Sequence, residues 1–461
     1  MFNFENRVSK KVHKNPSNLI QLVLFLIVTT FSMSVFADGF VLVSHVLEGW
    51  ELGNETEQKA IITYEDGIQK MILRIGLAKE QQKEAVWIFP VPSDPEDISI
   101  DITTNLPQFE GVDIIENAES NIKSITYGLL FTQIVPIPPI VLVSSAMLGM
   151  SGVSMEAGFE PGVTVHQQVV KEGVTSEVIT AKTASSIYEY LHTLGLDIDE
   201  GMLPVLDQYI GKKASFIVSW ISGDVNGSES KGVCVSFPTE KLYFPLIPTS
   251  IYGKKVVPAT IYVSGLVSPQ IYDDISPFVT VDYMSMEGYW GDPDPIGFCQ
   301  QGKSCFTKIR IKVPSERFTE DLWISRTPPL RAVVAWLFSE IPFEIMFLLS
   351  LFFFSALTGV LSGSIAFCLW EPRIGFKRLM KFALIGLSNC LTIIGLIVCM
   401  KLMKFRQIPQ EDKDKLEELR SRGYKVSLRD PRKTRFVLLF IVIFCTLVPL
   451  AFFGITNFIS G

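Results

Sequence analysis

Three carboxylates and one pair of cysteines are the residues of this chain whose types and spacing could do chemistry. Asp273, Asp274 and Asp292 could serve as general acids and bases if folding brought them into one cleft. Cys299 and Cys305 are separated by Gln-Gln-Gly-Lys-Ser and could close a short disulfide loop in an oxidising compartment. The alternative is that they stay reduced, because the odd number of cysteines in this region leaves the connectivity open.

Local motifs for catalysis and metal binding do not reach their required form. The four histidines include no His-Glu-x-x-His motif and no pair at ligand spacing. Gly149-Met150-Ser151-Gly152 is one residue short of a nucleophile elbow, and the acidic turn at 197–201 lacks the Glu that ends a calcium loop. We therefore assign no catalytic residue, no metal ligand and no cofactor from the sequence.

The first 37 residues have the three parts of a secretory signal. Four basic residues precede an apolar core that runs from Leu19 to Thr30, and Val35-Phe36-Ala37 ends with small residues at the positions that signal peptidases read. We expect residues 1–37 to be a signal peptide cleaved before Asp38. An uncleaved anchor helix is the alternative, and both place the following residues outside.

Three apolar stretches near the C-terminus predict membrane helices at about 345–370, 382–400 and 436–459. Residues 332–344 precede them and predict an interfacial helix. None of the three apolar cores contains an ionisable residue, which favours anchoring over transport. Gly359 and Gly363 form a small-xxx-small face on which another helix could pack closely, and this face suggests a subunit of a transport complex as a weaker alternative.

The basic loops between these helices give two possible topologies. Residues 371–381 and the basic loop 401–435, which has 12 basic and 6 acidic side chains, are both expected on the cytoplasmic side. Three full crossings would place 401–435 outside, whereas a re-entrant second segment would keep both loops inside. We expect three crossings, because 19 uncharged residues suffice to span a bilayer.

The region between the signal and the membrane helices, 38–331, is acidic and water-compatible. It has 38 acidic and 21 basic side chains, whereas residues 332–461 have 9 acidic and 16 basic ones. A strongly negative domain would repel phosphate, so we expect no nucleic acid partner.

Period-two patterns at 58–64 and 68–77, joined through Asp66-Gly67, predict a β-hairpin. Further strands are expected at 85–89, where the following prolines should end the strand or lie on an edge, and at 176–180, 214–221 and 307–313. Ile187, Tyr190, Leu191 and Leu194 predict an amphipathic helix, and 204–210 a second, shorter one. The fold class is therefore α+β, mainly antiparallel, with C-terminal transmembrane α-helices.

A proline-broken segment at 124–155 interrupts this domain. It contains no charge, follows an Asn- and Glu-rich stretch that we interpret as a linker, and passes through Pro136-Ile137-Pro138-Pro139. The prolines disfavour a straight crossing. An apolar loop packed on the domain and a short hairpin dipping into the bilayer surface are the two main interpretations, and a true crossing is the third.

Several elements of 38–330 resemble an uncharacterised prokaryotic family, the domain of unknown function 2330. They are Gln58-Lys59-Ala60-Ile61-Ile62, Trp87-Ile88-Phe89-Pro90-Val91-Pro92, the segment from Leu206-Asp207-Gln208-Tyr209-Ile210 to Phe216-Ile217-Val218, and Tyr243-Phe244-Pro245-Leu246. Many members carry Cys-Gly where this chain has Asp38-Gly39. The resemblance implies export and membrane tethering, and it implies no known activity.

Together these features predict a membrane-tethered extracytoplasmic binding or structural module of the cell envelope. It would lie in the cell membrane as a multi-pass protein, with residues 38–340 on the extracytoplasmic side. Its expected partners are the lipid bilayer and another envelope or membrane protein. An envelope enzyme with a site assembled from Asp273, Asp274 and Asp292 is the alternative.

Overall fold

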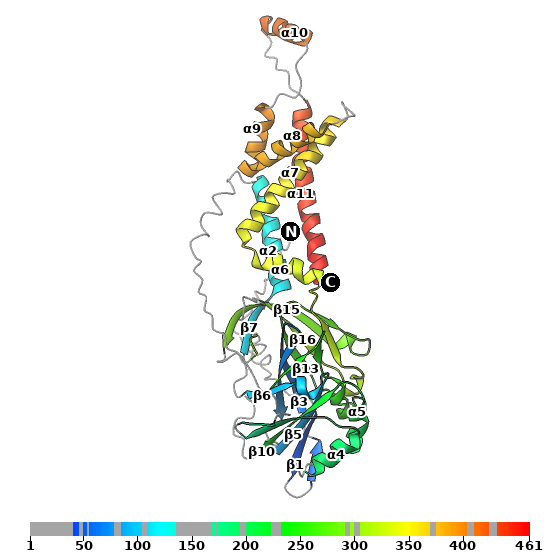
Figure 1. The fold of residues 1–461 in the computed structure, drawn as a ribbon. Coiled ribbons are helices and arrows are strands. Elements are labelled where there is room, and N and C mark those ends of the chain that lie inside the picture. Colours follow the sequence, from blue (N-terminus) through cyan, green and yellow to red (C-terminus); the bar gives the residue numbers. More distant parts are fainter. Residues whose placement is uncertain are drawn as a thin grey trace, which may run out of the picture.

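A β domain and a helical bundle follow one another along the long axis of the molecule (Figure 1). The computed structural model describes residues 40–45, 49–52, 55–77, 84–103, 108–134, 168–171, 173–193, 200–222, 232–290, 296–298, 305–368, 375–402, 410–423 and 431–461. The predicted signal peptide and the proline-rich turn at 136–139 lie outside these residues.

Two sheets form the body of the β domain. The six-stranded sheet has the order β2 (Gly49–Leu52), β1 (Phe40–His45), β5 (Glu84–Val91), β10 (Ser215–Ser222), β9 (Val174–Ile179) and β8 (Gln168–Lys171), and every pair is antiparallel.

The eight-stranded sheet has the order β6 (Ser99–Thr103), β11 (Gly232–Pro238), β4 (Ile68–Leu77), β3 (Glu55–Glu65), β13 (Ala259–Ser264), β16 (Cys305–Ile311), β15 (Val279–Trp290) and β7 (Gln108–Asp113). Only the β3–β13 pair is parallel among the strand pairs described. A small third sheet joins β12 (Leu242–Phe244), β17 (Leu322–Ser325) and β14 (Ser268–Gln270).

The predicted hairpin is confirmed as β3 and β4. Asp66 and Gly67 both have positive φ, 48° and 85°, as a tight two-residue turn between antiparallel strands requires. Gly meets this condition without steric cost, and Asp tolerates it better than most residues.

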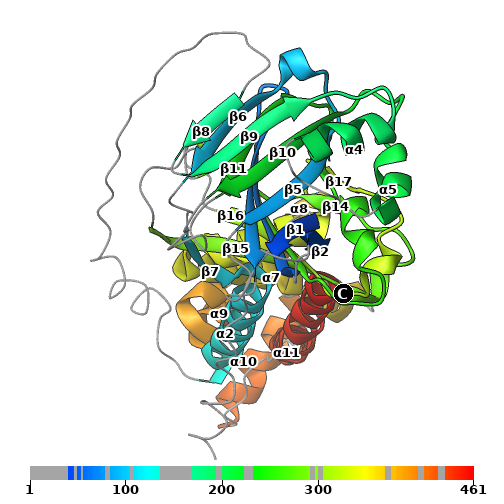
Figure 2. The same cartoon turned by 90° about the horizontal axis from the view of Figure 1, so that it is seen from below.

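Strand β5 shows how the period of two builds the core. Trp87 and Phe89 point to the layer between the two large sheets, together with Ile62 and Leu73. Val86 and Ile88 point the other way, onto the helices that cover the six-stranded sheet. These helices are α4 (Ala184–Thr193) and α5 (Leu203–Asp207), and they lie beside β10 and β5 when the molecule is seen from below (Figure 2).

Pro90 does not end β5, which continues to Val91 and pairs through Pro90 with Phe216 of β10. On its other side β5 pairs with β1 only as far as Ile88. Among the described residues Pro90 has no partner on β1, and a strand position without a neighbour on one side is where proline is tolerated in a sheet.

The Asn- and Glu-rich stretch is not a linker, because it forms the first half of helix α2 (Ile114–Ile134). Asp113 ends β7 and caps the helix, since its Oδ1 accepts hydrogen bonds from the N–H groups of Ile115 and Glu116 at 2.8 and 3.1 Å. The second half of α2 is the first part of the uncharged segment 124–155. This half of the helix carries exposed apolar side chains at Tyr127, Phe131 and Ile134.

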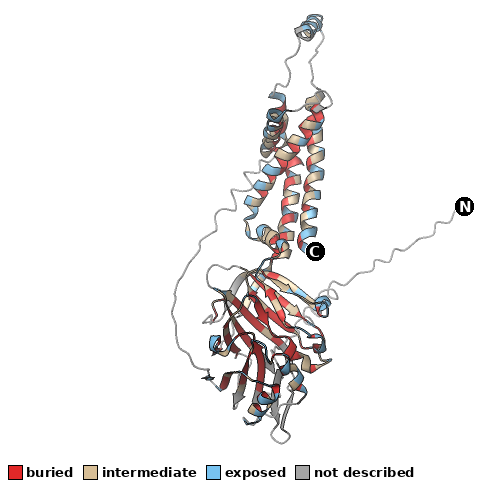
Figure 3. Ribbon diagram, turned by 45° about the vertical axis from the view of Figure 1, so that its right-hand side comes forward, coloured by how far each residue is buried: buried red, intermediate tan, exposed pale blue. Residues whose placement is uncertain are grey.

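The bundle also contains α6 (Leu330–Glu340), α7 (Phe343–Cys368), α8 (Phe376–Leu387), α9 (Thr392–Leu402) and α11 (Pro431–Ser460), with α10 (Gln410–Ser421) beyond its far end. Among the residues that the structure describes, three stretches are long and apolar enough to span a membrane: Phe343–Phe367, Phe376–Leu402 and Arg432–Ser460. Large exposed apolar side chains cover the outside of these helices, whereas buried residues fill the β domain (Figure 3). The chain is thus an α+β protein with transmembrane helices.

The structure also contains short 3-10 helices at Pro95–Asp97, Glu200–Met202, Ile247–Tyr252, Ser276–Phe278, Ser315–Arg317 and Ser388–Leu391.

Helices α8 and α9 form a broken pair instead of the straight span that we expected at 382–400. The break lies at Ser388–Leu391, and Thr392 follows it with a φ of 74°. Ser388 Oγ donates to the carbonyl of Ile385 at 2.6 Å. Such local side-chain hydrogen bonds compete with the helical ladder and favour a break here.

Both ends of this pair lie at the same end of the bundle. The ring of Phe382 in α8 lies 5.3 Å from that of Phe367 near the end of α7 and 6.3 Å from that of Phe436 near the start of α11. After the break the chain returns, because Lys433 Nζ donates to the carbonyl of Lys401 at 3.3 Å. The pair therefore has the geometry of a re-entrant hairpin, and its turn reaches Ser355 at mid-length of α7.

Candidate functional site

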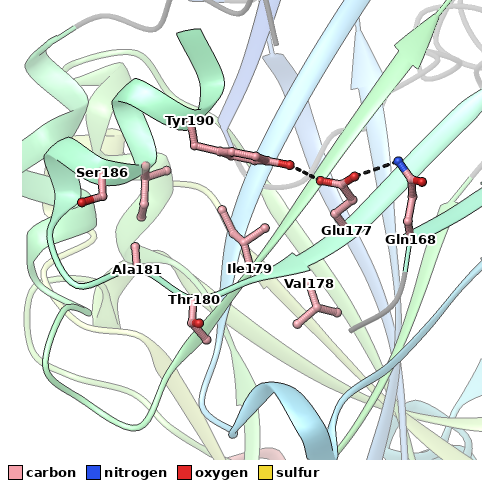
Figure 4. Close-up of a pocket in the computed structure, with 9 residues that line it drawn as sticks. Gln168, Glu177, Val178, Ile179, Thr180, Ala181, Ser186 and Tyr190 are labelled. Carbon is pink, nitrogen blue, oxygen red and sulfur yellow. Dashed lines mark hydrogen bonds between the residues drawn. The ribbon is translucent and has the colours of Figure 1, made fainter. Parts of the chain in front are cut away.

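A pocket of about 440 Å³ opens between the edge of the six-stranded sheet and helix α4 (Figure 4). Strand β9 supplies one wall and α4 the other, and Gln168 closes one side from β8. Side chains of β9 point alternately to the two faces of the sheet, so Val178 is buried and Glu177 faces the opening. On α4, Ile187 is buried, whereas Ser186 and Tyr190 lie toward the pocket.

Glu177 is the acidic group of this pocket. Its Oε1 accepts a hydrogen bond from Gln168 Nε2 at 2.8 Å, and its Oε2 accepts one from the hydroxyl of Tyr190. Burial, together with the hydrogen bond to Glu177 and its negative charge, raises the pKa of Tyr190 to about 12. Tyr190 is therefore a neutral donor at physiological pH, and it fixes the carboxylate in place.

This arrangement is suited to binding. A carboxylate held by two donors keeps free lone pairs for a ligand N–H or ammonium group. Val178, Ile179, Ala181 and Ile187 give the pocket apolar walls. The pocket thus fits a ligand that combines an apolar part with a hydrogen-bond donor or a positive charge.

A second carboxylate, Asp321, is enclosed by donors. It accepts hydrogen bonds from the hydroxyls of Tyr209 and Tyr243 at 2.9 Å, and from the N–H groups of Leu246 and Ile247 at 2.9 and 3.0 Å. Burial raises the pKa of Asp321 above its ordinary value. Burial and the nearby carboxylate also raise the pKa of both phenols. The cluster joins three chain segments that are distant in sequence, around residues 209, 243–247 and 321, and its geometry is that of a structural clamp.

The residues singled out from the sequence do not gather at either place. Asp273 and Asp274 lie in an exposed turn, where Asp274 Oδ2 accepts a hydrogen bond from Thr319 at 3.3 Å. Asp292 lies outside the described residues, so an enzyme site built from the three carboxylates stays a prediction. Cys305 begins β16 and Cys299 lies outside the described residues, so their disulfide also stays a prediction. Among the described residues, no three His, Cys, Asp or Glu side chains are grouped as metal ligands.

Gly359 and Gly363 face α8 of the same chain. A Cβ atom on Gly359 would lie 2.5 Å from the carbonyl oxygen of Phe382, and one on Gly363 would clash with the ring of Phe382. This small-residue face is therefore occupied within the chain. It gives no support to the weaker alternative of a transport-complex subunit.

Sequence reasoning did not find Glu177 or Tyr190 as a site. The strand and the helix that hold them were predicted, but their approach across 13 residues depends on how α4 packs on the sheet. The one indication of this site in the sequence was Glu177 itself, because it is a charged residue in a strand whose other side chains are mostly buried.

Comparison with known proteins adds little to this picture. No family model and no curated protein matches the chain, so the resemblance to the domain of unknown function 2330 stays a prediction. One solved structure, of a mutated baculovirus P35 after caspase cleavage, is weakly similar, at 10% sequence identity and a TM-score of 0.24. The alignment covers 59% of this chain and 100% of that one, and at this TM-score it carries no argument about function.

Proposed function

We propose that this protein is a membrane-anchored binding module of the cell envelope, whose β domain lies on the extracytoplasmic side and binds a partner at the Glu177 pocket. The observation that carries this proposal is a semi-enclosed carboxylate in an apolar-walled pocket on a domain that is fixed to membrane helices. The acidic composition of 38–331 and the predicted signal support export.

The attachment between the β domain and the bundle supports a role as a rigid platform. Helix α2 leaves β7 directly, and Asn117 Nδ2 and Asn121 Nδ2 donate at 2.9 Å to Ser339 Oγ and to the carbonyl of Phe338 in α6. Ser285 Oγ of β15 donates a hydrogen bond to Glu340 at the end of α6, and Ser460 Oγ at the end of α11 donates one to Glu119 of α2. A partner bound to the β domain would therefore be held in a fixed orientation to the bilayer.

The orientation follows from the charges. If α8 and α9 form a re-entrant hairpin, the chain crosses the bilayer twice, through α7 and α11, and both basic segments, 371–381 and 401–435, lie at the end opposite the β domain. Basic residues resist translocation, so this end would be cytoplasmic. The topology with three crossings places one of these segments outside, against the same rule.

Labelling of single introduced cysteines tests this orientation. Gly375→Cys and Lys415→Cys lie in the two basic segments, and Ser276→Cys lies on the exposed surface of the β domain. A membrane-impermeant maleimide should label the first two from the cytoplasmic side and the third from the outside, with the wild-type chain giving the background. Labelling of Lys415→Cys from the same side as Ser276→Cys would instead establish a third crossing.

Site-specific photocrosslinking in native membranes tests the binding role. A photoreactive residue at Ser186, on the exposed rim of the pocket, should form a crosslinked species that Glu177→Gln weakens. The same residue at Ser276, which is also exposed but lies away from the pocket, is the matched control. Equal crosslinking from both positions, or turnover by the purified chain that depends on Asp273 or Asp274, would contradict the proposal.

A further inference from the structure

Basic side chains from three helices gather at the end of the bundle that is distal to the β domain. We call them the basic collar: Lys377, Arg378 and Lys381 of α8, Lys401 of α9, and Arg432, Lys433 and Arg435 of α11. The described stretches 375–402 and 431–461 contain these seven basic residues and no acidic residue. Glu371 and Asp430 are the nearest acidic residues in sequence and lie outside the described residues.

The fold-back of α8 and α9 brings these charges to one level. Lys433 Nζ donates to the carbonyl of Lys401, and the guanidinium of Arg432 lies 5.3 Å from the centre of the Phe367 ring at the end of α7. Phe367 in turn contacts Phe382, one residue after Lys381. A straight third span would carry Lys401 to the opposite end, so the collar is a product of the hairpin.

The surroundings of the collar indicate the chemistry of its partner. Exposed apolar side chains of α8, at Phe376, Met380 and Leu384, lie on the same helix as three of the charges. Such a helix places its apolar residues among acyl chains while long basic side chains extend to the headgroup layer. Like charges at one level repel each other, and an anionic surface relieves this repulsion.

Two basic residues at α10, Lys415 and Arg422, form ion pairs with carboxylates of the same helix. Lys415 pairs with Glu411 and Arg422 with Glu418, each at 2.7 Å and at i, i+4 spacing. These basic residues are exposed and the helix lies beyond the collar in Figure 1, so it is a control for the loss of basic charge away from the collar.

We propose that the basic collar binds the headgroups of anionic glycerophospholipids, and that the protein therefore selects anionic over zwitterionic lipid at this end of the bundle. The inference rests on the hairpin geometry of the proposed topology and does not depend on which side of the membrane the collar faces. A lipid that spans several of these residues would also hold α8, α9 and α11 together.

Native mass spectrometry of the purified full chain, titrated with phosphatidylglycerol or phosphatidylcholine, tests the proposal. The wild type should bind phosphatidylglycerol more tightly, and the triple variant Lys377→Ala, Arg378→Ala, Lys381→Ala should weaken this binding about 10- to 100-fold, since each basic residue near an anionic surface is worth about fivefold. The control triple Lys415→Ala, Arg420→Ala, Arg422→Ala should bind like the wild type.

Two further arms keep the test decisive. The double variant Lys377→Gln, Arg435→Gln changes only exposed positions and should show a smaller loss if the larger variant does not fold. Inorganic phosphate should not compete with the lipid, because it lacks acyl chains. Equal loss in the collar and α10 variants, no lipid preference in the wild type, or full competition by phosphate would each overturn the proposal. Cysteine labelling reports the topology independently, so a failure of the topology is distinguished from a failure of lipid binding alone.

Discussion

One buried polar side chain in the β domain, Asp321, and one in the helical bundle, Asn389, are hydrogen-bonded in opposite ways. In the β domain, the carboxylate of Asp321 accepts hydrogen bonds from four groups. They are two phenol hydroxyls and two backbone N–H groups, and they come from segments that are distant from Asp321 in sequence. In the bundle, Asn389 at the tip of the hairpin donates to Ser355 Oγ at 3.4 Å, while its Oδ1 has no hydrogen-bond partner in the described structure.

The difference shows what holds each region together. A satisfied buried carboxylate fixes the segments that surround it, because moving any one of them strands a donor. The hairpin instead depends on close approach of backbones. Gly359 and Gly386 meet where no Cβ atom could fit, and the polar tip adds little.

The largest effect is expected at Asp321. Asp321→Ala would leave two phenols and two backbone N–H groups without their acceptor, and each stranded buried donor costs about 1–3 kcal/mol. We expect the free energy of unfolding of the β domain to fall by about 3 kcal/mol or more, measured by urea unfolding in mild detergent with tryptophan fluorescence. Asp274→Ala, in the exposed turn, is the control and should change it by less than about 0.5 kcal/mol. Similar losses in both variants would show that Asp321 does not hold its surrounding segments together.

The next effect is expected at Gly359 in α7. Gly359→Val would place side-chain atoms against the carbonyl of Phe382 and the backbone of Gly386, so α7 and α8 would have to separate. Overpacking of this kind costs about 1–3 kcal/mol, and SDS unfolding of the purified chain would measure it. Gly454→Ala in α11 is the matched control, because nothing lies within 4 Å of its Cβ position. If Gly359→Val is as stable as the wild type, close backbone approach does not hold the hairpin.

Local patterns predicted the parts of the fold that local physics decides. The Asp66-Gly67 turn gave the β3–β4 hairpin, and the spacing of Ile187 and Leu191 gave α4. Helix α2 was missed because its first half carries Asn117 and Asn121, which look solvated in the sequence but are bonded to α6.

The hairpin and the pocket could not be fully predicted, for different reasons. Length and apolarity at 382–400 fit a straight span. The break depends on local hydrogen bonds of Ser388 and Thr392 and on the hydrogen bond from Asn389 to Ser355 of α7. The Glu177 pocket depends on the packing of a helix on a sheet edge, which residue spacing along the chain does not encode.

Tyr190 provides a case between the two extremes, because its partner Glu177 is only partly enclosed. The pKa of Tyr190 is raised to about 12 in the folded chain from an ordinary value of 10. The stabilisation linked to this shift is therefore fully present below pH 10 and is lost as the pH rises toward about 12. Tyr190→Phe should reduce the loss of unfolding free energy between pH 10 and about 12, measured from the denaturant midpoints of unfolding at these pH values. Glu177→Gln should lower the pKa of Tyr190 only in part, since burial is the larger cause, and an unchanged phenol titration would contradict the pairing.

The smallest effect is expected at Asn389, and it is the sharpest test of the comparison. In Asn389→Leu the unpartnered Oδ1 disappears together with the amide, so no new polar group is stranded on that side. Ser355 loses one long hydrogen bond, but its hydroxyl can turn to a carbonyl of its own helix one turn earlier. We expect the free energy of unfolding of the bundle to change by less than about 1 kcal/mol, measured in the same SDS series as Gly359→Val, with Ser355→Ala as the control. A loss as large as that of Asp321→Ala would mean that Asn389 holds a further partner, and that the tip of the hairpin is itself a polar site.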